Sequence, residues 1–399
     1  MVDADQQGRE FRARAREWLT ANVPAQDTDD LGVAKRFQAA MHEAGFAGIT
    51  WPAAYGGAGL GEPAQLAFND AAKDFDLPTR PFIIGMGMCG PTIVDLGTEE
   101  QKSRYLPPLL RGEEIWCQLF SEPGAGSDVA SLQTRAVRDG DEWVLDGQKV
   151  WTTLAHLADF GAVLARTDPD VPKHQGLTMF IVDMHAPGVE VRPLRDMTGR
   201  APFNEVFFGN VRLGADSVIG TVGEGWRAAV VMLGHERVSI GTTVARRSDP
   251  LAFEVLAADA RANGLLDDQA VRTELAELYS RQRALQLFTA RLRQEANAGN
   301  PPGARGSVAK LVGALNSAFA VDVAGTVGGP SALAADADDQ HAIERAVAMN
   351  GAPSAAIAGG TNEIQRNIIG ERVLGLAKEP SVDRDVPFRE LKVGTQRAE

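Results

Sequence analysis

Cysteine and long apolar segments are scarce in this sequence of 399 residues. Only two cysteines occur, Cys89 and Cys117, which excludes a disulfide framework and favours a reducing compartment such as the cytoplasm. The first seven residues hold two aspartates and lack the basic and apolar regions of a signal peptide, so no secretion signal is expected. The longest apolar stretch, residues 81–94, is interrupted by glycines and is too short to span a bilayer.

Positive charge is outweighed by negative charge, and basic residues nowhere form a run of five. The chain has 40 Lys and Arg against 53 Asp and Glu, which gives a formal net charge of −13. Such a chain repels phosphate groups, so neither nucleic acid nor an anionic membrane surface is an expected partner. The 44% share of hydrophobic residues is ordinary for a globular protein, and the length predicts two or three domains.

The hydrophobic pattern divides the chain into helical, strand-like and again helical segments. In the first segment, Thr98 and Gln101 have the spacing of a capping box, which predicts a helix that is interrupted at Pro107 and Pro108. In the second, Asp146-Gly147 lies between runs of β-forming residues and predicts a hairpin turn, with another turn at Asp139-Gly140. Short strands are expected at 161–165, 177–182, 189–192 and 206–211. Long helices are expected at 267–296, 307–327, 343–350 and 363–376.

This order predicts an α+β multidomain fold. The expected parts are a helical domain over 1–117, a β domain over 118–225, a helical bundle over 226–385 and a polar surface tail over 386–399. A doubly wound nucleotide-binding sheet would need strands that alternate with helices throughout. The G-x-G-x-x-G pattern at residues 85–90 is therefore interpreted as close packing of helices at glycines, and not as a dinucleotide fingerprint.

Two polar motifs in the β segment carry recognisable chemistry. Residues 121–128 form a glycine-rich turn in which backbone N–H groups and the Ser127 hydroxyl can approach a phosphate. Trp151 offers a flat face to a flavin ring, and the hydroxyl of Thr153 can hydrogen-bond to a flavin heteroatom. Each motif alone is more often a tight polar loop or a buried strand, and the combination is what indicates a flavin site.

With these motifs, the sequence resembles the acyl-CoA dehydrogenase family. SEPGAGSD at 121–128, DGQKVWTT at 146–153 and GGTNEIQR at 359–366 match the signature segments of that family in order. WPAAYGG at 51–57 and GTEEQKSRYLPPLLRG at 97–112 match as well, so the resemblance covers about residues 10–380. It implies a helical N-terminal domain, a β-barrel-like middle domain and a C-terminal four-helix bundle, with FAD as the cofactor.

The resemblance also implies the residues that bind FAD. They are Phe120, Ser121, Gly126, Ser127, Trp151, Thr153, Thr361 and Glu363. The family takes further FAD contacts from a neighbouring subunit through an Arg-x-x-Phe-Gly element. Arg261 is the nearest match here, although no Phe follows it and the segment is shortened. Gly328-Gly329 matches a second neighbour-contact segment that lacks its usual Gln.

Dehydrogenation of a thioester needs a carboxylate that removes the α proton. Most family members place this Glu just before the Gly-Thr of the last signature, where this chain has Gly359. A minority that resembles isovaleryl-CoA dehydrogenase places it early in the C-terminal domain, before an Arg, and Glu236-Arg237 fits that position. Glu236 is therefore the predicted catalytic base, with a surface ion pair as the alternative reading. Arg237 is either structural or close to the CoA thioester, and Gly359 leaves room for a branched or bulky acyl group.

The resemblance implies conversion of an acyl-CoA to the trans-2-enoyl-CoA, with an electron-transfer flavoprotein as acceptor and a homo- or hetero-oligomer, dimer or tetramer, as the assembly. The sequence is also similar to actinobacterial members that act on steroid side-chain CoA esters as mixed oligomers. Two alternatives stay open. One is a non-catalytic or FAD-sharing subunit of a heteromeric dehydrogenase, and the other is a flavin oxidase or monooxygenase. No spacing of metal ligands is present, so no metal is expected.

Overall fold

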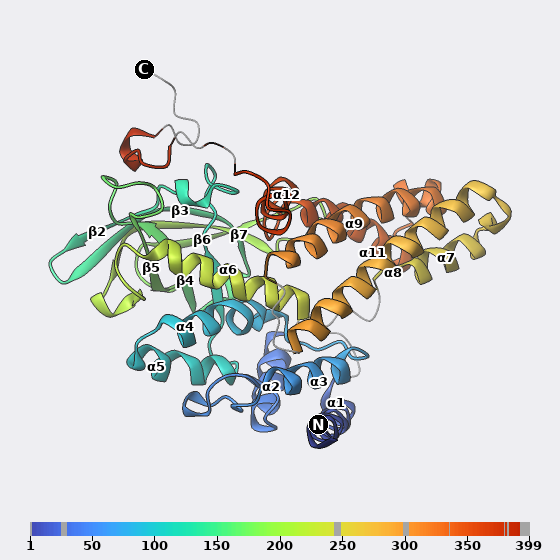
Figure 1. Cartoon of the computed structure of the whole chain (residues 1–399), viewed down its shortest axis with the longest axis horizontal. Helices are drawn as coiled ribbons and strands as arrows, with labels where there is room; N and C mark the ends of the chain where they lie inside the picture. The colour runs from blue at the N-terminus through green and yellow to red at the C-terminus, as the bar shows by residue number, and fades with distance from the viewer. Residues whose placement is uncertain are drawn as a thin grey trace. The chain divides into compact units, whose positions relative to one another are not determined.

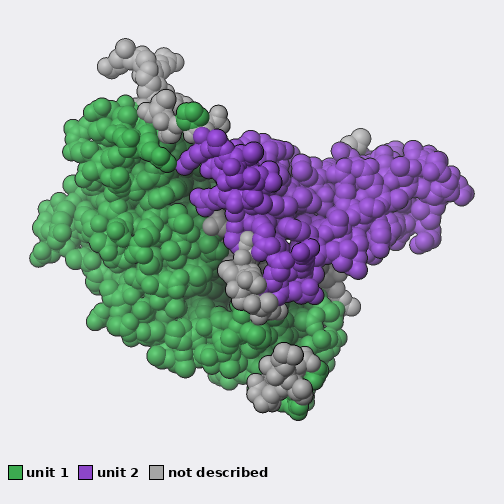
Figure 2. Space-filling model, in the orientation of Figure 1, with its two compact units in different colours: residues 1–196, 201–244, 380–399 green, residues 197–200, 245–379 purple. Residues whose placement is uncertain are grey.

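The computed structural model describes residues 2–24, 30–242, 249–297, 303–334, 336–378, 380 and 383–391. Contacts within the chain divide it into two compact units, which Figure 2 shows in different colours. Unit 1 comprises Met1–Asp196, Ala201–Val244 and Pro380–Glu399, and unit 2 comprises Met197–Arg200 and Ala245–Glu379. Each unit has a hydrophobic core of its own.

The N-terminal part of unit 1 is helical, as the sequence predicts. Its α-helices are α1 (Val2–Asn22), α2 (Leu31–Glu43), α3 (Glu62–Ala72), α4 (Gly90–Leu96) and α5 (Glu99–Leu110) (Figure 1). The predicted capping box is confirmed, because the Thr98 side chain accepts from the Gln101 N–H and the Gln101 side chain accepts from the Thr98 N–H. The predicted interruption at Pro107 and Pro108 is wrong. Both prolines lie in the last turn of α5, where missing N–H donors weaken only the end of the helix.

The glycines at residues 85–90 serve helix packing. Gly85–Cys89 forms a single π-helical turn that leads directly into α4. A Cβ atom added at Gly90 would lie 2.0 Å from the Trp51 ring, and one added at Gly85 would lie 2.6 Å from a Leu109 methyl group. This close approach confirms the packing interpretation of the glycine pattern.

Unit 1 also contains a mixed sheet, to which the described residues contribute eight strands in the order β6-β7-β3-β2-β4-β5-β8, with β1 paired to β4. The strands are β1 (Trp116–Leu119), β2 (Arg135–Asp139), β3 (Glu142–Thr153), β4 (Phe160–Arg166), β5 (Leu177–Asp183), β6 (Val189–Leu194), β7 (Phe203–Leu213) and β8 (Val218–Ile219). The four strands predicted from the sequence are confirmed as β4 to β7. β1, β2 and β8 were not predicted as strands.

The sheet is buried on both faces at β4. Ala162 and Leu164 belong to the core shared with the N-terminal helices, whereas Val163 and Ala165 belong to a second core. This second core also contains Trp143 and other residues of β3 and β7. The sheet therefore curves over an interior of its own, as expected of a barrel-like domain.

The hairpin predicted at Asp146-Gly147 is wrong. β3 runs through both residues, and its register with β7 shifts between Leu145 and Gly147, which marks a β-bulge. Gly147 has φ of 150°, and a Cβ atom there would lie 2.5 Å from the Thr134 hydroxyl. The hairpin turn lies instead at the other predicted position, where Gly140 has φ of 63° between β2 and β3. The Asp146-Gly147 pair thus marks a close backbone approach, whereas the Asp139-Gly140 pair marks the chain reversal.

Helix α6 (Gly225–Thr242) belongs to unit 1. It packs against β5, α4 and the π-helical turn, and it contributes Ala228, Ala229 and Met232 to the core. The position of α6 is therefore fixed by the same core that supports the helices and the sheet.

Unit 2 is a helical bundle. Its described α-helices are α7 (Phe253–Ala262), α8 (Gln269–Asn297), α9 (Gly306–Gly328), α10 (Pro330–Leu333), α11 (Gln340–Gly351) and α12 (Asn362–Ile368). The helices predicted at 267–296, 307–327 and 343–350 are confirmed. The one predicted at 363–376 is shorter, because α12 changes into a π-helical turn over Ile369–Val373.

Among the described residues, the helical stretch Gly303–Gly328 is long and apolar enough to cross a membrane. Four of its residues, Ala320, Val323, Ala324 and Val327, lie in the core of unit 2 with residues of α7 and α8. A core helix of a bundle has the same length and composition, so this feature is weak evidence for a membrane span.

We expect Gly90→Ala to destabilise unit 1 by about 1–3 kcal/mol, because the added methyl group must displace the Trp51 ring from a packed core. Urea unfolding followed by tryptophan fluorescence measures the change. Gly8→Ala in α1 is the control, since a Cβ atom there meets nothing within 4 Å. Equal midpoints for Gly90→Ala and the wild-type chain would show that the contact does not constrain this core.

Candidate functional site

The glycine-rich segment leaves the sheet at the end of β1. The backbones of Glu122 and Ala125 exchange hydrogen bonds of 3.0 and 3.1 Å and so close a tight turn. Gly124, Gly126 and Ser127 on this turn are exposed, and the side of Gly126 that would carry Cβ meets nothing within 4 Å. This part of the turn is therefore open to a ligand.

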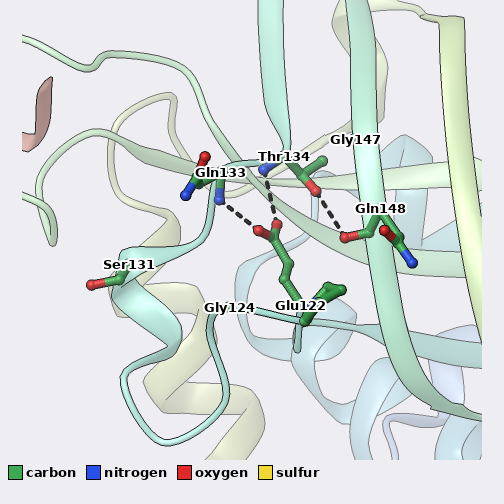
Figure 3. A pocket seen from close by; sticks show the side chains of 8 residues that line it. Glu122, Gly124, Ser131, Gln133, Thr134, Gly147 and Gln148 are labelled. Carbon is green, nitrogen blue, oxygen red and sulfur yellow. Dashed lines mark hydrogen bonds between the residues drawn. The ribbon is translucent and has the colours of Figure 1, made fainter. Parts of the chain in front are cut away.

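A buried ion pair holds the start of this turn. Lys149 of β3 is fully buried, and its Nζ donates to the Glu122 carboxylate at 2.9 Å and to the Phe120 carbonyl at 3.0 Å. The carboxylate of Glu122 also accepts from the backbone N–H groups of Gln133 and Thr134 at 2.6 and 2.9 Å, as Figure 3 shows. The pair therefore ties β1, β3 and the segment after the turn together.

The two charges respond differently to burial. Burial raises the pKa of Glu122, but Lys149 and the backbone N–H donors outweigh it and hold the pKa below its ordinary value. Burial also lowers the pKa of Lys149, and Glu122 compensates only in part. Glu122 is thus held as a carboxylate, and it serves as a structural anchor whose hydrogen bonds are already made within the chain.

A pocket of about 240 Å³ lies beside the turn (Figure 3). It is lined by Glu122, Pro123, Gly124, Ser131, Gln133, Thr134, Gly147 and Gln148. The bulge of β3 forms one wall and the turn forms the other. The lining offers amide and hydroxyl groups without a cation, and Trp151 is not part of it. The pocket therefore does not coincide with the contacts expected for a flavin ring.

The end of β3 presents an aromatic face. Trp151 has φ of 60°, an uncommon value for a bulky residue. The residue is 57% exposed, although the centre of its ring lies 5.8 Å from the centre of the Phe203 ring. Backbone strain of this kind persists only where the surrounding structure imposes it, and it occurs often at functional sites. The Val150 N–H donates to the Ser121 carbonyl at 2.9 Å, which brings the glycine-rich turn beside the residue that precedes Trp151.

The neighbouring threonines have different environments. Thr153 is half-buried, whereas Thr152 is buried and its hydroxyl has no hydrogen-bond partner among the described residues. A flavin with a pyrophosphate needs an aromatic face, an accessible glycine turn and nearby polar groups. The exposed Trp151 indole and the threonines of β3 supply the first and the last, and the turn after β1 supplies the second. The residues predicted for FAD in unit 1 therefore fit this cofactor.

Glu236 lies on the inward side of α6. It follows Ala229 and Met232 at positions i+7 and i+4, so it continues the face that is buried in the core, and it is half-buried itself. The adjacent His235 bonds to Asp95 through Nε2 at 2.8 Å, which connects α6 to α4. Arg237 is the next residue of the helix, and its side chain lies outside the described part of the structure.

In unit 2, the last signature forms a turn that begins α12. Gly359 and Gly360 have φ of 65° and 90°, and the Thr361 side chain caps the helix by accepting from Ile364 N at 3.3 Å. Lys310 near the start of α9 donates to the Gly360 carbonyl at 2.5 Å. Glu363 is exposed and pairs with Arg366.

Arg261 lies elsewhere in unit 2, exposed at the end of α7. The side chain of Asn263 donates to the Val327 carbonyl at 3.0 Å, which places the Arg261 turn beside the end of α9 and thus beside Gly328-Gly329. Lys310 and Val327 are 17 residues apart on α9, which corresponds to about 25 Å. Within unit 2, the two predicted neighbour-contact segments are thus close to each other and distant from Thr361 and Glu363.

Sequence reasoning missed the residues that support the turn. The main ones are Glu122 and Lys149. A lysine inside an apolar strand and a glutamate at the start of a glycine-rich turn are unusual in sequence, but nothing local shows that they pair. In the part of the chain that the structure describes, no three His, Cys, Asp or Glu side chains cluster as metal ligands do.

Comparisons with known proteins agree with this geometry. Three family models match the chain: the acyl-CoA dehydrogenase N-terminal domain at 5–113, the middle domain at 117–211 and the C-terminal domain at 223–374. The acyl-CoA dehydrogenase IpdE1 of Mycobacterium tuberculosis is 37% identical over 388 residues, which cover 93% of this chain and 98% of that protein.

Solved structures give the same result. The ChsE4-ChsE5 complex from Mycobacterium tuberculosis matches with 30% identity and a TM-score of 0.77, covering 94% of this chain and 98% of that one. The Tcur3481-Tcur3483 steroid acyl-CoA dehydrogenase matches with 28% identity and a TM-score of 0.79, covering 95% of this chain and 99% of that one.

The chain belongs to the acyl-CoA dehydrogenase family, whose members are oxidoreductases. The predicted fold, a helical N-terminal part, a middle sheet and a C-terminal helical bundle, is confirmed. The prediction of FAD as the cofactor is likewise confirmed by membership of this flavoprotein family.

We expect Lys149→Met to lower the free energy of unfolding by about 3–5 kcal/mol, because it leaves the Glu122 carboxylate buried without its cation. Adding Glu122→Gln should restore part of this loss. Urea unfolding measures both variants. Lys73→Met is the matched control, since Lys73 pairs with Asp70 on the surface, where such pairs contribute less than about 1 kcal/mol. Similar losses for the two lysines would contradict the anchoring role of Lys149.

Proposed function

We propose that this chain dehydrogenates the α,β bond of an acyl-CoA thioester with Glu236 as the catalytic base. The observation that carries the proposal is the position of Glu236, half-buried on the inward face of α6, in a chain that has glycine at 359. Glu236 belongs to unit 1, as do Ser121 and Trp151, which are the expected flavin contacts.

The conformation at residue 359 supports this choice of base. Gly359 has φ of 65°, in the left-handed region that residues with a side chain seldom adopt. A glutamate at this position would hold its backbone in a strained conformation. The turn that precedes α12 therefore suits glycine and not the base that most family members carry there.

The reaction divides the two hydrogens between two acceptors. The Glu236 carboxylate would take the α hydrogen as a proton, and the electron pair of that C–H bond would form the new double bond as the β hydrogen leaves as a hydride. Bound FAD would supply the two-electron acceptor for this hydride. The Phe120 to Ser127 segment and Trp151 would hold the cofactor, with the Ser121 hydroxyl close to the flavin. An electron-transfer flavoprotein is the proposed final acceptor.

The acyl group is proposed to be bulky and ring-bearing. The family resemblance expects residue 359 to lie beside the acyl group, and glycine has no side chain that would occupy this space. The name steroid acyl-CoA dehydrogenase, given to a structural relative of similar fold over nearly the whole chain, supports the same substrate class. A CoA ester that carries part of a steroid skeleton or its side chain is therefore the proposed substrate.

We expect an anaerobic titration with ring-bearing acyl-CoA esters to bleach the oxidised-flavin band of the wild-type protein. Glu236→Gln should retain the flavin and reduce it roughly 10²–10⁴-fold more slowly, because a neutral amide does not accept the α proton. Stopped-flow absorbance gives both rates. The protein should be purified with any subunit that accompanies it.

Glu254→Gln is the matched control, because Glu254 is an exposed residue of α7 and should reduce its flavin at the wild-type rate. Normal reduction by Glu236→Gln would eliminate Glu236 as the base. A clear preference for butyryl-CoA over ring-bearing esters would overturn the proposed substrate class.

A second candidate is an FAD-sharing subunit of a mixed oligomer. It is favoured by the separation of Arg261 from Thr361 and Glu363 in unit 2, since Arg261 could then serve the site of a neighbouring chain. The solved relative named as a ChsE4-ChsE5 complex also contains two different chains. The ratio of bound flavin to chain decides between the candidates. A ratio near one for the chain purified alone indicates a self-sufficient enzyme, whereas flavin that appears only with a partner chain indicates sharing.

A further inference from the structure

The described end of the chain is fastened to unit 1 by backbone hydrogen bonds. Phe388 N donates to Val171 O at 2.9 Å and Arg389 N donates to Pro169 O at 3.0 Å, while the Arg389 side chain pairs with Asp170. Residues 383–391, called here the C-terminal strap, thus lie against the loop between β4 and β5. Of the polar surface tail predicted over 386–399, residues 392–399 lie outside the described part of the structure, and Phe388 in the described part is half-buried.

Arg166 connects the C-terminal strap to the segment that follows the glycine-rich turn. It ends β4, is only 4% exposed, and its guanidinium lies 3.7 Å from the centre of the Phe388 ring. The same guanidinium donates to the Ala130 carbonyl at 2.6 Å and to the Lys173 carbonyl at 2.7 Å. Burial lowers the pKa of Arg166 to about 10, so the group stays charged at neutral pH.

Lys173 makes a second connection between the same parts. Its Nζ donates to the Asp383 carboxylate at 2.7 Å and to the Asp128 carboxylate at 2.9 Å, and its side chain is 12% exposed. Asp128 is the last residue of the glycine-rich signature and also accepts from the Ser131 hydroxyl. Burial lowers the pKa of Lys173, but the two carboxylates raise it by more, so it is charged at neutral pH.

These contacts fix the far end of the glycine-rich turn. The Glu122–Lys149 pair holds its start, and three residues between the two anchors, Gly124, Gly126 and Ser127, are exposed. A glycine-rich segment loses more conformational entropy on ordering than other segments do. A turn that is ordered before a phosphate arrives therefore binds it more tightly than one that must be ordered during binding.

We propose that the C-terminal strap, acting through Arg166 and Lys173, orders the turn at residues 123–131 and thereby increases the affinity for FAD. Arg166 and Lys173 are positioning residues in this arrangement. The inference rests on the proposed function, since it takes the turn to be the binding site for the pyrophosphate of the cofactor.

Coupling of this kind is reciprocal. If docking of the C-terminal strap favours FAD binding, FAD binding must favour docking of the strap by the same factor. Hydrogen–deuterium exchange at residues 383–391 should therefore slow when FAD binds, in addition to exchange at 123–131. A strap with a merely structural role would show no response to the cofactor.

The test uses the full-length protein with any subunit that accompanies it, freed of flavin and titrated with FAD by flavin fluorescence. A chain that ends after Pro380 loses both Asp383 and Phe388, and we expect its FAD dissociation constant to rise at least about tenfold, with a smaller rise for Asp383→Asn. A chain that ends after Leu391 is the control for truncation. Asp385→Asn is the matched control for Asp383→Asn, because Asp385 is exposed in the same strap.

Wild-type affinity for FAD in both Asp383→Asn and the chain that ends after Pro380 would overturn the inference. Hydrogen–deuterium exchange at 383–391 that is the same with and without FAD would also overturn it. The melting temperature of the flavin-free variants separates a specific effect from general unfolding, and it should remain within about 2 °C of the wild-type value for Asp383→Asn. A wild-type protein that binds no FAD would overturn the proposed function itself, whereas normal wild-type binding with unaffected variants would overturn only the role of the strap.

Discussion

The buried pair between Lys149 and Glu122 is the interaction on which the candidate site depends. Two charges removed from water are stable only when they are paired and when their remaining donors and acceptors are satisfied. The chain meets this requirement with Phe120 and with two backbone N–H groups, so the pair fixes β1, β3 and the segment before β2 in one arrangement. Without that arrangement, the glycine-rich turn and Trp151 would not be held in fixed positions relative to each other.

The same constraint explains how a turn that contains glycines can hold a defined shape. Its start is fixed by the buried pair, and its far end is fixed by Arg166 and Lys173, whose charges are again balanced by carbonyl and carboxylate groups. The exposed part between the two anchors keeps its backbone available to a ligand. The charged groups around this turn thus act as supports, and the predicted catalytic group, Glu236, lies on a separate helix that the hydrophobic core positions.

Much of the fold could be predicted from local patterns. The capping box at Thr98 and the strands β4 to β7 depend on the residues beside them, and the structure contains both. Prediction failed where a distant residue decides the outcome. The sequence predicts a hairpin turn at Gly147, yet Thr134 lies so close to this glycine that β3 continues through a bulge. The two prolines of α5 predict an interruption of the helix, although the helix already ends in the turn that contains them.

The sequence by itself determined the family and the cofactor, because these follow from short motifs in a fixed order, and it predicts Glu236 as the base. The tertiary structure alone decided which residues support the motifs. Lys173 and Asp383 are 210 positions apart and meet only because the strap returns to the sheet. The left-handed backbone of Trp151 and the separation of Arg261 from Thr361 along α9 are likewise absent from any local pattern. Propensities act between neighbouring residues, whereas buried charges find their partners only after the chain has folded.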